Sequence, residues 1–331
     1  MTQKLEPIAT PAGFRLNLVE SHSSNYRQIQ AQLFDSITCH LPADQVTRRH
    51  KKGVDEAVNI AVFVRANRKG VPKPLPAEVF LSHGLADKNY TLIRNRDTRK
   101  PFLNLFRDVL VPGDWMKRKL LHHEDVELPA DRIHVVGWPR LDGLLGDDRG
   151  AVRSERDPER LVRILWAPSH DFQRYGDDQV PLSSYPEFEP SFEKLADHAE
   201  TRLSLHPRNR ENKTPTNDDL LWADVVVSDF GTMVYEAWAL GKPVIFPRWI
   251  LQDRLPRFLP GSAEAFIFEN DIGLHPGSYD ELVDLVRIGS TVEPDVKSFL
   301  DDYLDPSTYG RSGRMIAEKL VEIHARDHGA G

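Results

Sequence analysis

Short apolar runs alternate along the chain with longer segments in which apolar residues recur at helical spacing. Most of the runs are continuous, which is typical of strands buried on both faces of a parallel sheet. The pattern predicts helices after Ser24, from about Thr232 and over residues 315–323. It predicts strands at residues 13–20, 78–82, 108–112, 133–137, 163–168, 202–206, 224–228, 243–247 and 265–269.

This alternation of strands and helices predicts two Rossmann-like α/β domains with parallel sheets. The length of 331 residues also fits about two domains. A charged, glycine-containing stretch at residues 146–160 lacks apolar periodicity and is the predicted linker. We therefore expect an N-terminal domain at residues 1–150 and a C-terminal domain at residues 151–331, which ends in an amphipathic helix.

The composition is that of a globular protein, with 40% hydrophobic and 28% charged residues and a net charge of −7. Cys39 is the only cysteine, so nothing indicates an internal disulfide. No apolar stretch approaches the ~18 residues of a membrane span. The first residues lack the pattern of a secretory signal, and we expect a cytoplasmic protein.

Charge is distributed unevenly, because residues 1–150 carry a net positive charge and residues 151–331 a net negative one. Basic residues concentrate at positions 45–120, which include the run RRHKK. A basic half favours an anionic partner such as a phosphate-rich acceptor or an anionic membrane surface, but a well-solvated face explains it equally well. No aromatic-interleaved or helix-turn-helix pattern accompanies these charges, so we expect no nucleic-acid partner.

Ligands of open parallel sheets bind outside the carboxyl ends of the strands, so the residues after each predicted strand carry the candidate chemistry. His83 and Gly84 follow the strand at 78–82, and Lys88 adds a cation nearby. A neutral imidazole can remove a proton from an alcohol, and Gly84 would let a substrate approach the backbone closely. We interpret His83 as a candidate general base, although a lone histidine is more often structural.

The segment VVVSDFGTMVYE is a candidate phosphate-binding turn. It leads from a strand through Ser228, Asp229 and Gly231 into a helix from Thr232, whose N–H groups and positive dipole end would face an anion. The hydroxyls of Ser228 and Thr232 can add hydrogen bonds, and Glu236 could accept from a ribose hydroxyl. An ordinary capped strand–turn–helix is the alternative.

Other predicted strand ends carry cations or hydroxyl groups. Ser169 belongs to the polar run SHD that follows one strand. His206 and Arg208 lie together at another strand end, where they could neutralise and protonate a leaving phosphate, or form a capped loop with exposed charges. Arg140 could bind phosphate, or it could interact with Asp142 and organise the loop.

Several other kinds of site lack support in the sequence. Paired aspartates at 147–148, 177–178, 218–219 and 301–302 lie in predicted loops without a third ligand, so we expect no metal site. A single cysteine excludes a cysteine-based zinc cluster. The absence of Walker, G-x-S-x-G and G-x-G-x-x-G motifs removes the usual support for a kinase, a hydrolase or a dehydrogenase.

Taken together and in order, six segments resemble motifs of the CDP-glycerol glycerophosphotransferase family, which includes teichoic-acid primases and polymerases and capsule enzymes. The resemblance covers roughly residues 78–323. The segments are SHGLADK, LPADRIHVVGWPRLD, RILWAPSHD, LSLHP, ADVVVSDFGTMVYEAWALGKPVIF and YGRSGRMIAEKLVEI. They are similar to the family's HG-x-x-x-K, G-x-P-R-x-D, I-L-x-A-P-T, L-x-x-H-P, A-D-x-x-I-T-D-Y-S-S and D-G-x-A-x-x-R-I.

The resemblance implies a GT-B fold, in which parallel sheets face a central crevice and the C-terminal domain holds the donor nucleotide. It implies transfer of glycerol phosphate, or a related polyol phosphate, from CDP-glycerol to a hydroxyl of a glycan or lipid-linked acceptor, with release of CMP. No tightly bound cofactor is implied, and dependence on magnesium stays open. His83 would activate the acceptor hydroxyl, with Gly84 and Lys88 on the acceptor side, and His206 would stabilise the donor pyrophosphate. The implied donor-binding residues are Arg140, Ser169, Arg208, Ser228, Asp229, Gly231, Thr232 and Glu236.

One departure from the family pattern leaves the donor open. Gly231 and Thr232 stand where the family has two serines, so one hydroxyl is lost. Glu236, followed by ALGKPVIF, is also reminiscent of nucleotide-sugar GT-B enzymes and of UDP-N-acetylglucosamine 2-epimerases. A glycosyltransferase, an epimerase-like enzyme and a non-catalytic binding protein are therefore the alternatives, and the basic half could place the protein at the inner face of the cell membrane.

Overall fold

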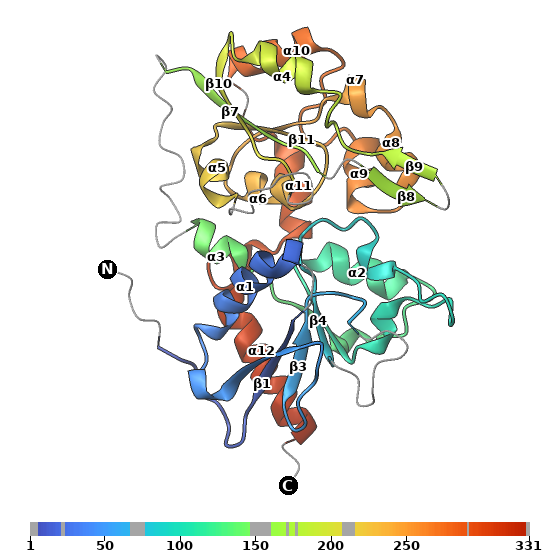
Figure 1. Cartoon of the computed structure of the whole chain (residues 1–331), viewed down its shortest axis with the longest axis vertical. Coiled ribbons are helices and arrows are strands. Elements are labelled where there is room, and N and C mark those ends of the chain that lie inside the picture. The colour runs from blue at the N-terminus through green and yellow to red at the C-terminus, as the bar shows by residue number, and fades with distance from the viewer. Residues whose placement is uncertain are drawn as a thin grey trace. The chain divides into compact units, whose positions relative to one another are not determined.

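The computed structural model describes residues 6–20, 24–66, 77–145, 160–169, 172–175, 178–206, 216–289 and 291–328 (Figure 1). The chain divides into two compact units. The first unit comprises residues 1–83, 90–147 and 301–331, and the second unit comprises residues 84–89 and 148–300. Among the described residues, 84–89 therefore fall in the second unit and 301–328 in the first, outside the domain ranges expected for them. Almost all of the predicted linker lies outside the described residues.

The first unit contains a parallel six-stranded sheet in the order β2-β1-β3-β4-β5-β6. Its strands are β1 (Leu16–Glu20), β2 (Val46–His50), β3 (Val58–Ala61), β4 (Val79–Leu81), β5 (Asp108–Val111) and β6 (Ile133–Val135). Its helices are α1 (Ser24–Thr38), α2 (Asp114–His122), α3 (Arg140–Leu145) and α12 (Ser312–His328), with short 3₁₀ turns at Ala43–Gln45, Tyr90–Leu92, Phe102–Leu105, Ala130–Arg132 and Pro306–Thr308. The predicted strands at 13–20, 78–82, 108–112 and 133–137 are confirmed.

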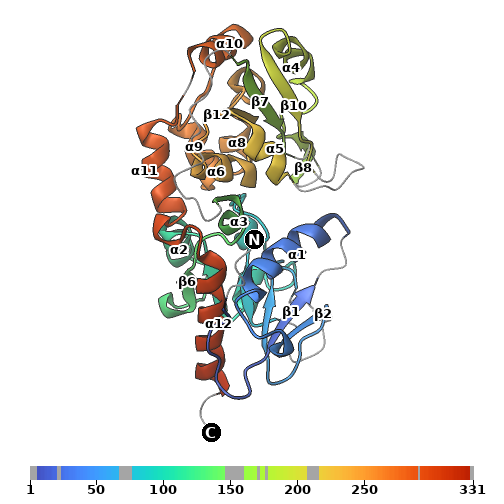
Figure 2. The same cartoon turned by 90° about the vertical axis from the view of Figure 1, so that its left-hand side faces the viewer.

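The C-terminal helix α12 packs against α1 and α3 within the first unit (Figures 1 and 2). Asp142 of α3 accepts hydrogen bonds from the backbone N–H groups of Ser312 (3.0 Å) and Gly313 (2.7 Å). At the N-terminal end of a helix, a carboxylate binds backbone N–H groups that have no partner within the helix, and it interacts favourably with the helix dipole. A Cβ on Gly313 would lie 2.0 Å from the Ser36 carbonyl oxygen, so a glycine is needed where α12 meets α1.

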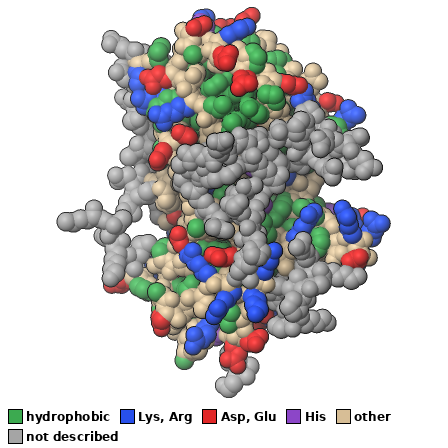
Figure 3. All heavy atoms as spheres, viewed as in Figure 1, with side chains coloured by type: hydrophobic (Ala, Val, Ile, Leu, Met, Phe, Trp, Pro, Cys, Tyr) green, Lys and Arg blue, Asp and Glu red, His purple; other side chains and the backbone are tan. Residues whose placement is uncertain are grey.

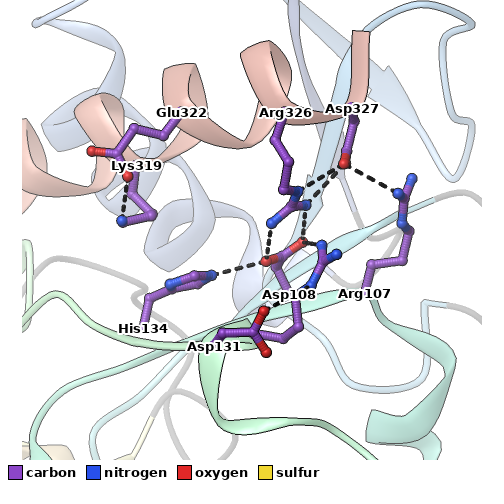
Figure 4. A network of polar contacts seen from close by, with 9 residues as sticks. Arg107, Asp108, Asp131, His134, Lys319, Glu322, Arg326 and Asp327 are labelled. Carbon is purple, nitrogen blue, oxygen red and sulfur yellow. Dashed lines mark hydrogen bonds and ion pairs between the residues drawn. The ribbon is translucent and has the colours of Figure 1, made fainter. Parts of the chain in front are cut away.

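A network of charged side chains fixes the other end of α12 to the sheet (Figure 4). Asp108, the fully buried first residue of β5, accepts two hydrogen bonds from Arg326 at 3.0 and 2.7 Å. It also contacts His134 Nε2 at 2.8 Å, and Asp327 binds Arg107 at 3.2 Å. Burial alone would raise the pKa of Asp108, but the hydrogen bonds from His134 and Arg326 outweigh it and hold that pKa well below its usual range.

The second unit contains a parallel four-stranded sheet in the order β10-β7-β11-β12 and an antiparallel pair, β8 with β9. The strands are β7 (Val162–Ala167), β8 (Phe172–Tyr175), β9 (Asp178–Pro181), β10 (Ala199–Leu203), β11 (Val225–Ser228) and β12 (Val244–Ile245). The helices are α4 (Glu189–Leu195), α5 (Asn217–Trp222), α6 (Thr232–Ala239), α7 (Arg248–Leu251), α8 (Arg254–Phe258), α9 (Ala263–Glu269), α10 (Tyr279–Ile288) and α11 (Pro294–Tyr303), the last of which leads back into the first unit.

The core of the second unit explains its continuous apolar strands. Trp166 of β7 is fully buried and packs edge-on against Phe188, with ring centroids 5.1 Å apart. Val225 and Val227 of β11 belong to the same buried cluster. Because β7 and β11 are buried on both faces, their side chains cannot alternate between apolar and polar types.

The predicted strand at residues 265–269 is wrong, because this run lies in helix α9. Ser262 caps that helix, and its hydroxyl accepts a hydrogen bond from the backbone N–H of Ala265 at 3.0 Å. An apolar run this short fits a buried strand or a buried helix equally well, and here the N-terminal cap decides.

Four strands of the structure have no counterpart among the predicted elements. They are β2, β3, β8 and β9. Strand β2 contains the start of the basic run RRHKK and pairs in the sheet only with β1, so its sequence lacks an apolar pattern. The turn at Glu56, where φ is +61°, leads into the buried strand β3.

Candidate functional site

The candidate donor site lies at the carboxyl ends of β7 and β11, two neighbouring strands of the second unit. The register pairs Ala167 with Ser228, so the segments that follow both strands leave the sheet side by side. The backbone N–H of Ser169 donates to Asp229 Oδ2 at 2.9 Å, which joins the two segments. The structure thus brings together two of the strand ends that the sequence singles out.

Asp229 is held entirely within the fold. It has no exposed surface, and its carboxylate accepts hydrogen bonds from the hydroxyls of Ser183, at 2.8 Å, and Ser184. Burial raises the pKa of Asp229, and the hydrogen bonds from Ser184, Ser169 and Ser183 oppose this without cancelling it. Ser228 is also fully buried, and its hydroxyl donates to the Ala167 carbonyl at 2.7 Å. Both side chains therefore hold the carboxyl ends of β7 and β11 in place from inside the fold.

Helix α6 begins directly after this turn. Gly231 precedes it with φ of +125° and ψ of 177°, a backbone conformation open in practice only to glycine. Thr232 opens the helix, and its Oγ1 accepts a hydrogen bond from the Leu85 N–H at 3.0 Å. Glu236, on the next turn of α6, is fully buried. The predicted strand–turn–helix is confirmed, including the helix start at Thr232.

The segment 84–89 is attached to this turn and to helix α9. A Cβ on Gly84 would lie 2.8 Å from Thr232 Oγ1, so a side chain there would crowd the α6 start. Glu264 of α9 accepts hydrogen bonds from the backbone N–H groups of Asp87, at 2.9 Å, and Lys88, at 2.8 Å. In return, Asp87 Oδ2 accepts from the N–H of Ala263 at 2.9 Å.

Lys88 extends from this segment to the carboxyl ends of β7 and β11. Its Nζ donates to Ser169 Oγ at 3.2 Å and lies 4.3 Å from the centre of the Phe230 ring. The sequence led us to expect Gly84 and Lys88 on the acceptor side. The structure places both residues in the second unit, beside the candidate donor site.

His83 belongs to the first unit, where it follows β4. Its ring stacks on Phe63, with centroids 5.0 Å apart, and meets Tyr90 edge-on at 4.7 Å. The Tyr90 hydroxyl also accepts a hydrogen bond from the Val64 N–H at 3.2 Å. Aromatic contacts on two sides fix the orientation of the half-buried imidazole, as a base with a defined direction would need.

The remaining predicted site residues are spread over the chain. Arg140 opens α3 in the first unit, and its neighbour Asp142 is engaged by the backbone of α12. His206 follows β10 in the second unit and is half-buried. Arg208 lies outside the described residues. Among the described residues, no group of three or more His, Cys, Asp and Glu side chains is arranged to hold a metal ion.

Sequence reasoning missed the residues that support the site. Glu264 is the clearest case, since it is 2% exposed and also accepts a hydrogen bond from the Tyr235 hydroxyl at 2.8 Å. The serines at 183 and 184, which hold Asp229, are likewise absent from the predicted set. The pattern Ser262 followed by an acidic residue two positions later could have marked the start of α9, and with it Glu264.

Comparisons with known proteins bear on this geometry. No family model matches the chain. It is 26% identical over 223 residues to the teichoic acid ribitol-phosphate polymerase TarK of Staphylococcus aureus (strain NCTC 8325 / PS 47), covering 57% of this chain and 40% of TarK. It is 25% identical over 255 residues to TarL of the same strain, covering 65% and 43%. The matched region therefore spans less than half of these curated relatives.

Solved structures match almost the whole chain. The wall teichoic acid polymerase TagF aligns with a TM-score of 0.61 at 14% identity, over 95% of this chain and 90% of the other. A UDP-N-acetylglucosamine 2-epimerase from Listeria monocytogenes, described as putative, aligns with a TM-score of 0.50 at 13% identity, over 96% and 98%. At such identities the likeness concerns the fold alone. The expected α/β fold of GT-B type is confirmed, and so is the resemblance to the CDP-glycerol glycerophosphotransferase and teichoic-acid polymerase family.

Proposed function

We propose that this protein transfers a polyol phosphate, glycerol phosphate or a relative of it, from a CDP-activated donor to a hydroxyl group of a glycan or lipid-linked acceptor. The product would belong to a cell-wall or capsule polymer. The similarity to TarK and TarL, whose names describe ribitol-phosphate polymerases, supports this class of reaction. The proposal goes beyond those matches in the donor, the acceptor and the released CMP.

In the proposed reaction, the acceptor oxygen forms a bond to the β-phosphorus of the donor. The bond between that phosphorus and the bridging oxygen breaks, and CMP leaves with the electron pair. His83 takes the proton of the acceptor hydroxyl, in keeping with its oriented imidazole. The donor phosphates bind at Gly231 and Thr232, where the N–H groups of α6 point outward from the helix. Catalysis rests on positioning and on stabilisation of charge.

The observation that carries the proposal is the turn from β11 into α6. It combines a strand end, a glycine at φ of +125° and a helix start, and a lysine reaches the same strand ends. An anion is stabilised in such a place by N–H groups, by the helix dipole and by a cation. His206 and Arg208 are proposed to neutralise the donor pyrophosphate as well, and Arg140 and Glu236 remain proposed nucleotide-binding residues.

Partners and location follow as part of the proposal. The face in Figure 3 shows Lys and Arg side chains gathered over the elements of the first unit, with Asp and Glu among them. Such a surface fits contact with an anionic lipid or a phosphate-rich acceptor. No helix within the described residues is long and apolar enough to cross a membrane. We propose a cytoplasmic protein that acts at the inner face of the membrane.

Isothermal titration with CDP-glycerol, CDP-ribitol, CMP, UDP-N-acetylglucosamine and UDP, each with and without magnesium, tests the donor class. The proposal predicts selective binding of a CDP-polyol. Selective binding of the UDP ligands would overturn it in favour of a glycosyltransferase or of an epimerase-like enzyme. Binding of none of them would favour a non-catalytic protein of the same fold.

A further inference from the structure

The lysine that the sequence assigns to the acceptor has a different set of neighbours in the structure. Lys88 follows His83 by five residues, yet its backbone and its ammonium both pack in the second unit. We propose that Lys88 binds the donor phosphates, and that Glu264 is the positioning residue that holds it there. This inference rests on the proposed function and adds a donor contact to it.

The attachment of the segment is unusually specific. Glu264 and Asp87 are 2% and 1% exposed, and each accepts hydrogen bonds from the backbone next to the other. Burying a carboxylate is unfavourable unless hydrogen bonds compensate for the lost water. The buried carboxylates of Glu264 and Asp87 need these hydrogen bonds, so they restrict the position of Lys88 more than apolar packing would.

The backbone at Lys88 is in a strained conformation. Lys88 has φ of +45° and Asn89 has φ of +52°, both in the left-handed region that residues with a Cβ rarely adopt. The Lys88 N–H is bonded to Glu264 Oε2 at 2.8 Å, and the Asn89 side chain donates to the Pro260 carbonyl at 3.1 Å. Contacts that hold a strained backbone are often found where a side chain must be aimed.

The side chain of Lys88 is aimed at the ends of both central strands. Ser169, which follows β7, accepts from Nζ at 3.2 Å, and Phe230, which follows β11, lies under it at 4.3 Å. Ser169 is in turn fixed by the buried carboxylate of Asp229. The ammonium therefore lies where the turn before α6 would receive a phosphate.

The chemistry of the proposed reaction needs a cation at this point. When the bond to the bridging oxygen breaks, negative charge grows on the departing CMP phosphate. A lysine ammonium is a compact point charge that suits phosphate oxygens, and a preorganised one stabilises the developing charge without moving. Lys88 is such a preorganised cation, because Glu264 accepts a hydrogen bond from its backbone N–H and holds it in place.

The test compares donor affinities of substituted proteins by isothermal titration. Lys88→Met removes the charge and keeps an apolar stem over Phe230, and Lys88→Arg keeps the charge. Lys194→Met is the matched control, since Lys194 also lies over an aromatic ring, that of Tyr279 at 6.0 Å, but on α4. We expect Lys88→Met to weaken CDP-glycerol binding about 10- to 100-fold, Lys88→Arg to retain most of the affinity, and Lys194→Met to bind as the wild type does.

A double-mutant cycle separates positioning from folding. If Glu264 acts through Lys88, Glu264→Gln weakens donor binding in the wild-type protein but causes no further loss of affinity in the Lys88→Met protein. A general loss of structure would instead weaken donor binding in both proteins. Melting curves of all variants are recorded alongside, and Lys88→Met, which leaves the buried carboxylates in place, carries the decision if Glu264→Gln does not fold.

The outcomes distinguish this inference from the proposed function. Equal affinity of the wild type and Lys88→Met for CDP-glycerol would overturn the role of Lys88 and leave the proposed donor in place. If the wild type instead prefers UDP-N-acetylglucosamine, the proposed donor is wrong and the same comparison on that ligand decides the role of Lys88. A wild type that binds no nucleotide overturns both.

Discussion

Asp108 in the first unit and Asp229 in the second are both fully buried, yet they lie at opposite ends of their strands and have opposite kinds of partner. Asp108 opens β5 and is surrounded by cationic or protonatable side chains, chiefly Arg326 and His134. Asp229 follows β11 and is held by one backbone N–H and two serine hydroxyls. One carboxylate joins a helix to a sheet, and the other shapes the segments at the candidate donor site.

The pKa values of the two groups move in opposite directions for this reason. Burial acts on both, but at Asp108 the hydrogen bonds from His134 and Arg326 outweigh it, whereas at Asp229 burial prevails over the serine hydrogen bonds. A buried carboxylate is therefore not by itself a sign of a binding site. What distinguishes Asp229 is the carboxyl end of a parallel strand, where ligands of such sheets bind.

Removal of the proposed base should have the largest effect. We expect His83→Ala to lower the rate of CMP release from CDP-glycerol about 10²- to 10⁴-fold while donor affinity stays within about twofold, because the base acts on the acceptor. The exposed His198 provides a matched control, and His198→Ala should keep the rate. Full turnover of His83→Ala would remove the base from the proposed mechanism.

Removal of the ion-pair network should destabilise the first unit without affecting the donor site. Asp108→Asn leaves Arg326 and His134 without their shared carboxylate, and we expect the free energy of unfolding to fall by about 2–3 kcal/mol. Urea unfolding measures this, and donor titration below the transition should match the wild type. A donor affinity that falls with stability would contradict the division between a structural and a functional carboxylate.

A pair of glycine substitutions tests the turn before α6. Gly231→Ala forces a Cβ into φ of +125°, and we expect a loss of about 1–3 kcal/mol together with weaker donor binding. In contrast, Gly143 lies within α3, and an added Cβ would have no atom within 4 Å apart from its chain neighbours and the backbone of its own helix, so Gly143→Ala should stabilise the protein by up to about 1 kcal/mol. Equal unfolding curves for the two variants would show that the turn at Gly231 is not strained.

The smallest effect concerns pH. Because its pKa is depressed, Asp108 stabilises the protein at pH values above 3.8, the usual pKa of an aspartate. This contribution is lost as the pH falls below 3.8. Because its pKa is raised, Asp229 favours folding most at low pH, and its contribution falls as pH rises above 3.8. The stability difference between wild type and Asp108→Asn should thus shrink toward acid pH, and that between wild type and Asp229→Asn should shrink toward neutral pH. If the two stability differences changed with pH in the same direction, the opposite pKa shifts of Asp108 and Asp229 would be contradicted.

The local sequence pattern was enough to predict the two strand ends that form the candidate site. The continuous apolar runs of β7 and β11 predict a parallel sheet, and the polar residues after them include Ser169, Asp229 and Thr232, which the structure brings into one place. The same reasoning failed for α9, because a short apolar run does not distinguish a helix from a strand. It failed for β2 because an edge strand with polar residues has no apolar signal.

The placement of residues 84–89 could not be predicted from neighbouring residues at all. The hydrogen bonds that hold the segment join Leu85 to Thr232 and Asp87 to Glu264, across 147 and 177 positions of the chain. A motif shows that Lys88 follows His83, but only the tertiary structure shows that the two residues pack in different units. For the same reason the role of Glu264 was not foreseen, because the pattern of Ser262 and Glu264 could have marked only the start of α9.

The central claim is that the chain moves a polyol phosphate from a CDP-activated donor. The most direct measurement incubates the purified protein with CDP-glycerol or CDP-ribitol and a lipid-linked glycan acceptor, and follows CMP and the acceptor by mass spectrometry. We predict equimolar formation of CMP and of an acceptor heavier by one polyol phosphate. Transfer of a sugar from UDP-N-acetylglucosamine to the acceptor, with no product from either CDP donor, would contradict the account.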